Sequence, residues 1–328
     1  MVTCSSDRTF RVYDVSKAVV AGGENNKLSA KSELQDPQQE QHLQKLQHVV
    51  PLVDDSAAPV YRVAWAHPKF GALLALAAQD GKVYIYREEL VQQGVGEAGN
   101  VTEWCLKHVH EFHSLAVLSI AWAPYEYGLC LASASADGQV SFLTYMREGW
   151  VATSSFRNSE EGMGCTAVSW APYNSLGSQG PQGPIQRVTT GSCNHAVTIW
   201  QLVSVPQENG SAGSNYWKIE NTLYGHNDWV RDVSWAPNVG IPANVIASGS
   251  DDHTVRVWTQ DEINGEWTRH IVHTFHAPVY RISWSLTGSV LSVAAGDDEI
   301  TFWKQQKNHK WTQMSSVTDQ GAALLTSS

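Results

Sequence analysis

The sequence predicts an all-β protein in which six small antiparallel sheets, or blades, stand around a common axis as a β-propeller. A strand–turn–strand pattern recurs six times along the 328 residues. A second element, ending at a Trp, precedes five of the six turns. The chain also holds 14 Trp, a large number that a fold with one repeated aromatic slot accommodates. Six turns therefore predict six blades.

Each copy begins with a polar turn residue, followed by apolar residues at the third and fifth positions after it and usually an aromatic at the sixth. The turn residues are Asp7, Asp80, Asp137, Asn194, Asp252 and Asp297. Asp and Asn favour tight turns because their side chains accept hydrogen bonds from nearby backbone N–H groups. Positions three and five share one face of a strand and position six lies on the other, so the strand is expected to be buried on both faces.

Three further segments complete each repeat. In four copies a small apolar strand precedes the turn, as at 131–135 and 246–250. Alternating large and small residues before it predict another strand, at 63–67, 120–124, 168–172, 233–237 and 282–285. A last strand follows most copies, for example at 103–106, 217–219 and 267–271. Four-stranded units placed radially cover one another's faces and shield most sheet edges.

The fifth unit has the most complete signature, with Gly225-His226, Asp252 and Trp258 in the order typical of WD repeats. We predict a buried hydrogen-bond network across this blade, formed by His226, Ser248 (or Ser250), Asp252 and Trp258. The repeat gives His226 and Asp252 a structural role, which we favour over an acid–base pair. His113 and His276 occupy the comparable place in the third and sixth units.

Composition argues against several classes of protein. Hydrophobic residues make up 42% and charged residues 16% of the chain, enough to form a packed core. The net charge of −10 disfavours direct nucleic-acid binding, which depends on clustered Lys and Arg. None of the five Cys lies at zinc-site spacing, and the chain has neither a secretory signal nor a long apolar run. We expect no direct membrane insertion and folding in the cytosol or nucleus.

No catalytic, cofactor-binding or metal-ligating constellation stands out. Residues 94–99 match the dinucleotide motif, but they lie in a Gln-rich loop without the required strand and helix. His270 and His273 fall on opposite faces of a strand, whereas His108 and His110 share one face and are a weaker metal alternative. We therefore predict a protein that is not an enzyme, with no catalytic residue, no cofactor and no metal.

The predicted domain organisation is a single propeller over residues 1–314. It carries a long insertion at 15–58, rich in Gln and expected to be disordered; a short helix that docks on a partner is the alternative. Residues 315–328 are expected to form a flexible C-terminal tail.

Several stretches resemble one family, the WD-repeat SEC13 family, the small propeller subunit of the COPII outer coat and of the outer-ring scaffold of the nuclear pore. Residues 225–237, which run from Gly225 through Arg231 to Pro237, are the most distinctive of these stretches. Others are 3–8, 63–68, 143–145, 240–242 and 283–285. A generic WD repeat shares the turn and the Trp but not the string around Arg231.

The resemblance implies an open six-bladed propeller that scaffolds endoplasmic-reticulum-to-Golgi transport and the nuclear pore without catalysis. An α-solenoid partner would insert a seventh blade between the first and last units. That partner is the large propeller/α-solenoid subunit of the outer coat, or a solenoid nucleoporin of the outer ring. The expected locations are the cytoplasmic face of endoplasmic-reticulum exit sites and COPII vesicles, and the nuclear envelope at nuclear pores.

The first blade departs from the family pattern, because Met1 falls inside what should be its second strand. We therefore expect the first blade to be incomplete. The candidate edge for the partner's blade is Val2, Thr3, Cys4, Phe10 and Val12.

Two other functions remain as alternatives. One is a related propeller nucleoporin confined to the pore. The other is a WD-repeat adaptor that reads peptides on the top of the propeller, where large aromatic and Arg side chains would form a binding hot spot. The candidate partner-contact face is Tyr61, Arg62, Trp229, Arg231, Tyr280 and Arg281.

Overall fold

The computed structural model describes residues 1–14, 45–51, 58–92, 100–158, 163–180, 183–205, 214–240, 243–296, 299–307, 310–318 and 323–325. Within these residues there is no α-helix, and two 3₁₀ turns, η4 (Pro68–Phe70) and η5 (Tyr125–Tyr127), follow inner strands. No helix in the described part of the chain is long and apolar enough to cross a membrane.

The strands form six antiparallel sheets in chain order. The first contains β1 (Val2–Cys4), β2 (Thr9–Asp14) and β3 (Lys45–Pro51). The second contains β4 (Val60–Trp65), β5 (Leu73–Ala78), β6 (Lys82–Gln92) and β7 (Asn100–Glu111). The third contains β8 (Val117–Trp122), β9 (Cys130–Ser135), β10 (Gln139–Met146) and β11 (Gly149–Arg157).

The fourth sheet contains β12 (Cys165–Trp170), β15 (Arg187–Ser192), β16 (Ala196–Val205) and β17 (Ser214–Tyr224). The fifth contains β18 (Val230–Trp235), β19 (Asn244–Ser250), β20 (Thr254–Gln260) and β21 (Thr268–Thr274). The sixth contains β22 (Val279–Trp284), β23 (Val290–Ala295), β24 (Glu299–Gln305), β25 (Trp311–Thr318) and β26 (Ala323–Leu325). A small hairpin, β13 (Gln179–Gly180) and β14 (Gly183–Pro184), lies between β12 and β15.

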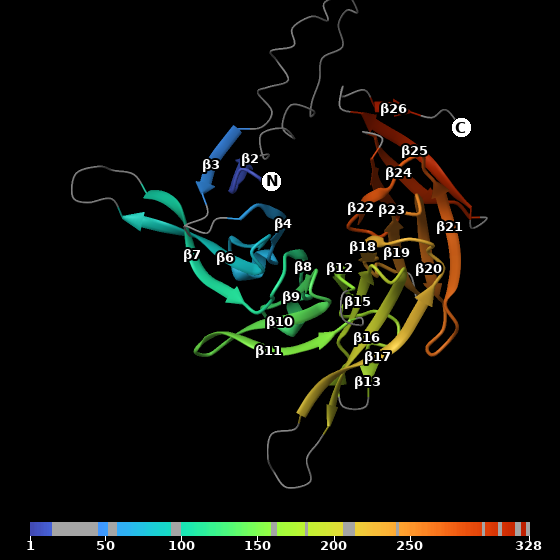
Figure 1. Ribbon diagram of the computed structural model, residues 1–328, viewed down its shortest axis with the longest axis horizontal. Coiled ribbons are helices and arrows are strands. Elements are labelled where there is room, and N and C mark those ends of the chain that lie inside the picture. The colour runs from blue at the N-terminus through green and yellow to red at the C-terminus, as the bar shows by residue number, and fades with distance from the viewer. Residues whose placement is uncertain are drawn as a thin grey trace, which may run out of the picture.

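The sheets stand around a common centre in sequence order, with β4, β8, β12, β18 and β22 on the inside (Figure 1). Each of these inner strands packs on the next one. In β8, β12 and β22 the Trp that ends the strand strengthens this contact, because its indole N–H donates to a backbone carbonyl of the preceding inner strand. The Nε1–O distances are 3.1 Å from Trp122 to Ala64, 3.0 Å from Trp170 to Ala121 and 3.0 Å from Trp284 to Ser234.

The core lies between neighbouring sheets. Every residue of β5, β9 and β15 is buried, because each of these second strands has a sheet on both faces. Glycines permit the closest approaches: a Cβ at Gly249 would lie 2.6 Å from Cγ1 of Val279 in the next sheet. The predicted all-β WD-repeat propeller architecture is therefore confirmed.

The predicted turn chemistry is also confirmed wherever the turn is described. Oδ1 of the turn residue accepts a hydrogen bond from the backbone N–H two positions later, at 2.9 to 3.0 Å, in the turns of Asp7, Asp80, Asp137, Asn194 and Asp252. The sixth turn residue, Asp297, lies outside the described residues.

Two expected boundaries differ from the structure. Strand β3 (Lys45–Pro51) falls inside the expected insertion and pairs with β2, because its alternating residues can extend the first sheet. The rest of the insertion, 15–44 and 52–57, lies outside the described residues. The expected end of the propeller at 314 falls inside β25, which pairs with β24 as far as Thr318 and also with β26.

Candidate functional site

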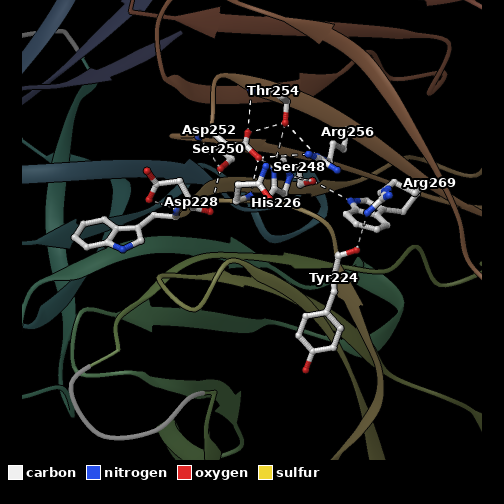
Figure 2. Close-up of polar contacts among 12 residues, drawn as sticks. Tyr224, His226, Asp228, Ser248, Ser250, Asp252, Thr254, Arg256 and Arg269 are labelled. Carbon is white, nitrogen blue, oxygen red and sulfur yellow. Dashed lines mark hydrogen bonds and ion pairs between the residues drawn. The ribbon is translucent and has the colours of Figure 1, made fainter.

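The fifth unit brings His226, Ser248 and Asp252 of the predicted network together (Figure 2), and Trp258 joins them through Ser248. His226 Nδ1 lies 2.9 Å from Oδ2 of Asp252, and His226 Nε2 lies 2.7 Å from Oγ of Ser248. The indole Nε1 of Trp258 donates to the same Ser248 oxygen at 2.9 Å. Ser250, the alternative serine, instead donates to the carbonyl of Asp228 and accepts from the N–H of Asp252.

The electrostatics of this network suit a structural role. Burial lowers the pKa of His226, although its hydrogen bond to Asp252 partly opposes the shift. Burial raises the pKa of Asp252, but hydrogen bonds from His226 and Thr254 outweigh it and hold that pKa below its ordinary range. A neutral His226 that donates from Nδ1 and accepts at Nε2 satisfies both neighbours. All four groups are thus used within the blade.

The third and fourth sheets contain related networks. In the third, His113 contacts Asp137 at 3.2 Å and Ser133 at 2.9 Å. In the fourth, the indole of Trp200 donates to both Asn158 and Thr190. The sixth sheet differs from the expectation for His276: this residue is exposed, and the apolar Val293 stands where β19 has Ser248.

The two histidines considered as possible metal ligands, His108 and His110, form other contacts in the structure. His110 is buried and its Nε2 lies 2.9 Å from Oγ of Ser141, while His108 stacks on Trp150. Burial, with a smaller contribution from His113, lowers the pKa of His110 to about 4. Across the described residues no group of three or more His, Cys, Asp or Glu is arranged to hold a metal ion.

The inner edge of the first sheet is unpaired in the described chain. Strand β1 pairs with β2 on one side only, whereas β5, β9, β15, β19 and β23 each lie between two strands. Val2, Thr3 and Cys4 therefore lie at this edge, as expected. Phe10 and Val12 do not: β2 lies between β1 and β3, and both side chains are buried against the second sheet. Their expected place on the edge was wrong because they belong to a middle strand.

Among the described residues, the last sheet has one covered and one uncovered face. Along β23 burial alternates, with Leu291, Val293 and Ala295 buried against the fifth sheet and the residues between them partly exposed. Ile300 on β24 belongs to the second face and is 44% exposed. The uncovered face consists of Val290, Ser292, Ala294, Ile300 and Phe302.

A cavity of about 440 Å³ joins this uncovered face to the first sheet. Cys4 lines it from β1, Arg62 from β4, and Arg281 and Ile300 from the last sheet. We call this space the seam. Figure 1 shows the first sheet in blue and the last sheet in red, facing each other at the two ends of the series of sheets.

Trp65 marks the seam and was missed in the sequence. It ends β4 as Trp170 and Trp235 end their inner strands, yet it is 41% exposed, whereas they are 7% and 5% exposed. The first sheet contributes no inner strand in the described chain, so the carbonyl that would accept from Trp65 is missing. The sequence contained a sign of this exposure: a strand that ends at a Trp precedes every turn except the first, so the first sheet was expected to lack the inner strand on which Trp65 would pack.

The candidate partner-contact face gathers around the axis. Tyr61, Arg231, Tyr280 and Arg281 line a second cavity of about 320 Å³. Arg231 forms a two-point ion pair with Asp251, at 2.7 and 2.5 Å, and lies over the exposed ring of Trp229 at 5.0 Å. Arg62 does not line this second cavity but lines the seam.

Comparison with known proteins gives consistent results. The family model described as WD domain, G-beta repeat matches residues 217–259. The chain is 34% identical to "Protein transport protein SEC13" of Cryptococcus neoformans, over 97% of this chain and 91% of that protein. It is 33% identical to "Protein transport protein sec13" of Aspergillus fumigatus, over 97% and 92%. It is also 34% identical to "Protein SEC13 homolog" of Drosophila melanogaster, over 96% and 76%.

Proposed function

Because the chain belongs to the SEC13 family of WD-repeat proteins, we propose that it is a non-catalytic scaffold subunit in protein transport. Its place is the COPII outer coat, which carries cargo from the endoplasmic reticulum to the Golgi, and the outer-ring scaffold of the nuclear pore. The names of the relatives support a role in protein transport. The assignment to the coat and to the pore is based on the family resemblance.

The observation that carries the proposal is the half-covered last sheet. In the second, third and fourth sheets every residue of the second strand is buried, but in the last sheet only alternate residues of β23 are buried. Apolar side chains such as Ile300 and Phe302 remain accessible there, and across the seam the edge of β1 has unpaired backbone groups. Strands added from outside would cover the apolar face and pair with the edge.

We therefore propose that the ring is open and that an α-solenoid partner closes it with a seventh blade. In the coat this partner is the large propeller/α-solenoid subunit, and at the pore it is a solenoid nucleoporin. The protein then acts at the cytoplasmic face of endoplasmic-reticulum exit sites and COPII vesicles, and at the nuclear envelope. It needs neither direct nucleic-acid binding nor insertion into the bilayer.

A scaffold without catalysis agrees with how the polar groups are used. The side chains that could act as acid or base form hydrogen bonds inside the blades and line neither the seam nor the second cavity. These are His113, His226 and Asp252. The groups that do line the seam are mainly apolar side chains and the charges of Arg62, Asp232 and Arg281. This is the composition of a binding surface.

The test is co-purification of the tagged chain with its outer-coat subunit from the same organism. We expect stoichiometric recovery of that subunit, and loss of recovery for Ile300→Glu, which places a charge on the uncovered face. Ile271→Glu is the control, because Ile271 is 54% exposed, against 44% for Ile300, but lies on the outer strand β21. Recovery of neither a coat subunit nor a nucleoporin, or equal effects of the two variants, would refute the proposal.

One observation favours a second candidate, the peptide-reading adaptor. Tyr280 and Arg231 line the second cavity, and the exposed ring of Trp229 lies against Arg231. An ion pair with Asp251 holds Arg231 in place. Such a rigid aromatic and Arg surface is typical of a hot spot. Alanine variants of Trp229 and Arg231 should lose partners that Ile300→Glu retains if this candidate is correct. Imaging separates the pore-only alternative, which gives nuclear-rim staining without exit sites.

A further inference from the structure

The seam carries an excess of positive charge. Two Arg side chains, Arg62 and Arg281, line it together with one acid, Asp232. The whole chain has the opposite balance, with 32 Asp and Glu against 22 Lys and Arg. The excess at the seam is therefore local and does not follow from the average composition.

The single acid is already engaged. Oδ1 of Asp232 accepts from Nη1 of Arg62 at 3.0 Å, and Oδ2 accepts from the backbone N–H of Ile282 at 3.1 Å. Arg281 has a weaker contact, a hydrogen bond of 3.4 Å from its Nη2 to the carbonyl of Tyr61. Desolvation by the surrounding atoms, together with the nearby charge of Arg62, lowers the pKa of the Arg281 guanidinium, and the charge of Asp232 partly opposes this shift. Among the described residues that line the seam, two guanidinium groups therefore share one carboxylate, and its ion pair is with Arg62.

The register of the inner strands shows what Arg281 faces. In two inner strands the third residue accepts a hydrogen bond from the backbone of the next inner strand. Oγ of Ser119 on β8 accepts from the N–H of Val168 on β12, and Asp232 on β18 accepts from Ile282 on β22. Arg281 is the third residue of β22 and lines the seam, so an inner strand added after β22 would lie beside its side chain.

A guanidinium can only donate hydrogen bonds. A strand added after β22 would therefore need to present an acceptor to Arg281, where Val168 and Ile282 present an N–H to the preceding strand. In a site that a new strand shields from water, a charged acceptor is favoured over a neutral one.

We infer that the innermost strand donated by the partner carries an Asp or Glu whose carboxylate binds Arg281 in the seam. This inference rests on the proposed function and names the chemistry by which the donated blade is recognised. Arg62 remains paired with Asp232, and the incoming acid neutralises the excess charge when the seam is closed. The apolar face supplies contact area, and the Arg281–carboxylate pair fixes the register of the donated strand.

The experiment measures the affinity of the full chain for its purified outer-coat subunit, using Arg281→Gln, Arg281→Lys and a control, Arg147→Gln, in the turn between β10 and β11. Truncating one partner of a desolvated charge pair should weaken binding at least about 30-fold. Arg281→Lys should recover part of this loss, and Arg147→Gln should bind like the wild type. The salt dependence of the affinity should be shallower for Arg281→Gln.

A scan of the partner completes the test. Each Asp and Glu of the donated segment is replaced by Asn or Gln, and one replacement should show no further loss when combined with Arg281→Gln. Wild-type affinity for Arg281→Gln, or additive losses for every acid, would overturn the inference while leaving the proposed function intact. Failure of the wild-type chain to bind would overturn both, and a melting temperature near that of the wild type would show that Arg281→Gln is folded.

Discussion

Ser248→Ala tests the blade network most directly. Ser248 is fully buried, donates its hydroxyl to Nε2 of His226 and accepts from the indole of Trp258. Removal of the hydroxyl leaves Nε2 of His226 and the indole N–H of Trp258 buried without a hydrogen bond. Each such group costs about 1 to 3 kcal/mol, so the free energy of unfolding should fall by roughly 2 to 4 kcal/mol.

Urea unfolding followed by tryptophan fluorescence measures this loss, with Ser292→Ala as the control. Ser292 lies on the partly exposed face of β23 and donates to the carbonyl of Ser283, so its removal should cost less than about 0.5 kcal/mol. The double variant Ser248→Ala/Trp258→Phe should lose less than the sum of the single variants, because it also removes the orphaned indole N–H. Equal losses for Ser248→Ala and Ser292→Ala would refute the reasoning.

Three further predictions concern packing, pH and the seam. Gly249→Ala should lower the free energy of unfolding by about 1 to 3 kcal/mol, because its Cβ would overlap Val279; urea unfolding that matches the wild type would contradict this. The pKa of His110 is about 4 in the fold and about 6.5 in the unfolded chain. The unfolded chain therefore binds a proton first as the pH falls, so the free energy of unfolding is highest above about pH 6.5 and decreases between about pH 6.5 and 4. Melting temperature should therefore drop between pH 7 and pH 5, and His110→Gln should reduce the drop. Trp122→Phe should lower the free energy of unfolding of the free chain by about 1 kcal/mol, because the indole of Trp122 donates to the carbonyl of Ala64. Trp65→Phe should lower it by less than about 0.5 kcal/mol. Equal losses in urea unfolding would argue against the missing inner strand.

The repeat could be predicted from sequence because it rests on local chemistry. Turn residues such as Asp80 and Asp137 bond to the backbone two positions later, and this contact depends on only a few neighbouring residues. The His226 network was predictable for a similar reason: one repeat contains all four members at fixed spacing. Both features depend on short-range patterns that recur along the chain.

The seam was less predictable because it depends on which elements are absent beside a strand. The place of Phe10 and Val12 was predictable, because they have the same pattern as their equivalents in other repeats, which also lie inside their sheets. The pairing of Arg62 with Asp232 joins two inner strands 170 residues apart in sequence. Strand β3 was placed in an insertion because the Gln-rich composition of residues 15–58 was interpreted as unable to support a core.

The tryptophan contacts between inner strands also determine how the ring responds to force. Indole N–H groups join β8 to β4, β12 to β8 and β22 to β18, so a displacement of one blade is passed to its neighbour through short, directional bonds. Among the described residues, the first sheet offers Trp65 no inner strand to bond to. We therefore expect the seam to yield to force more readily than the joints that these indole bonds cross, with a stiffness determined by the strands that fill it.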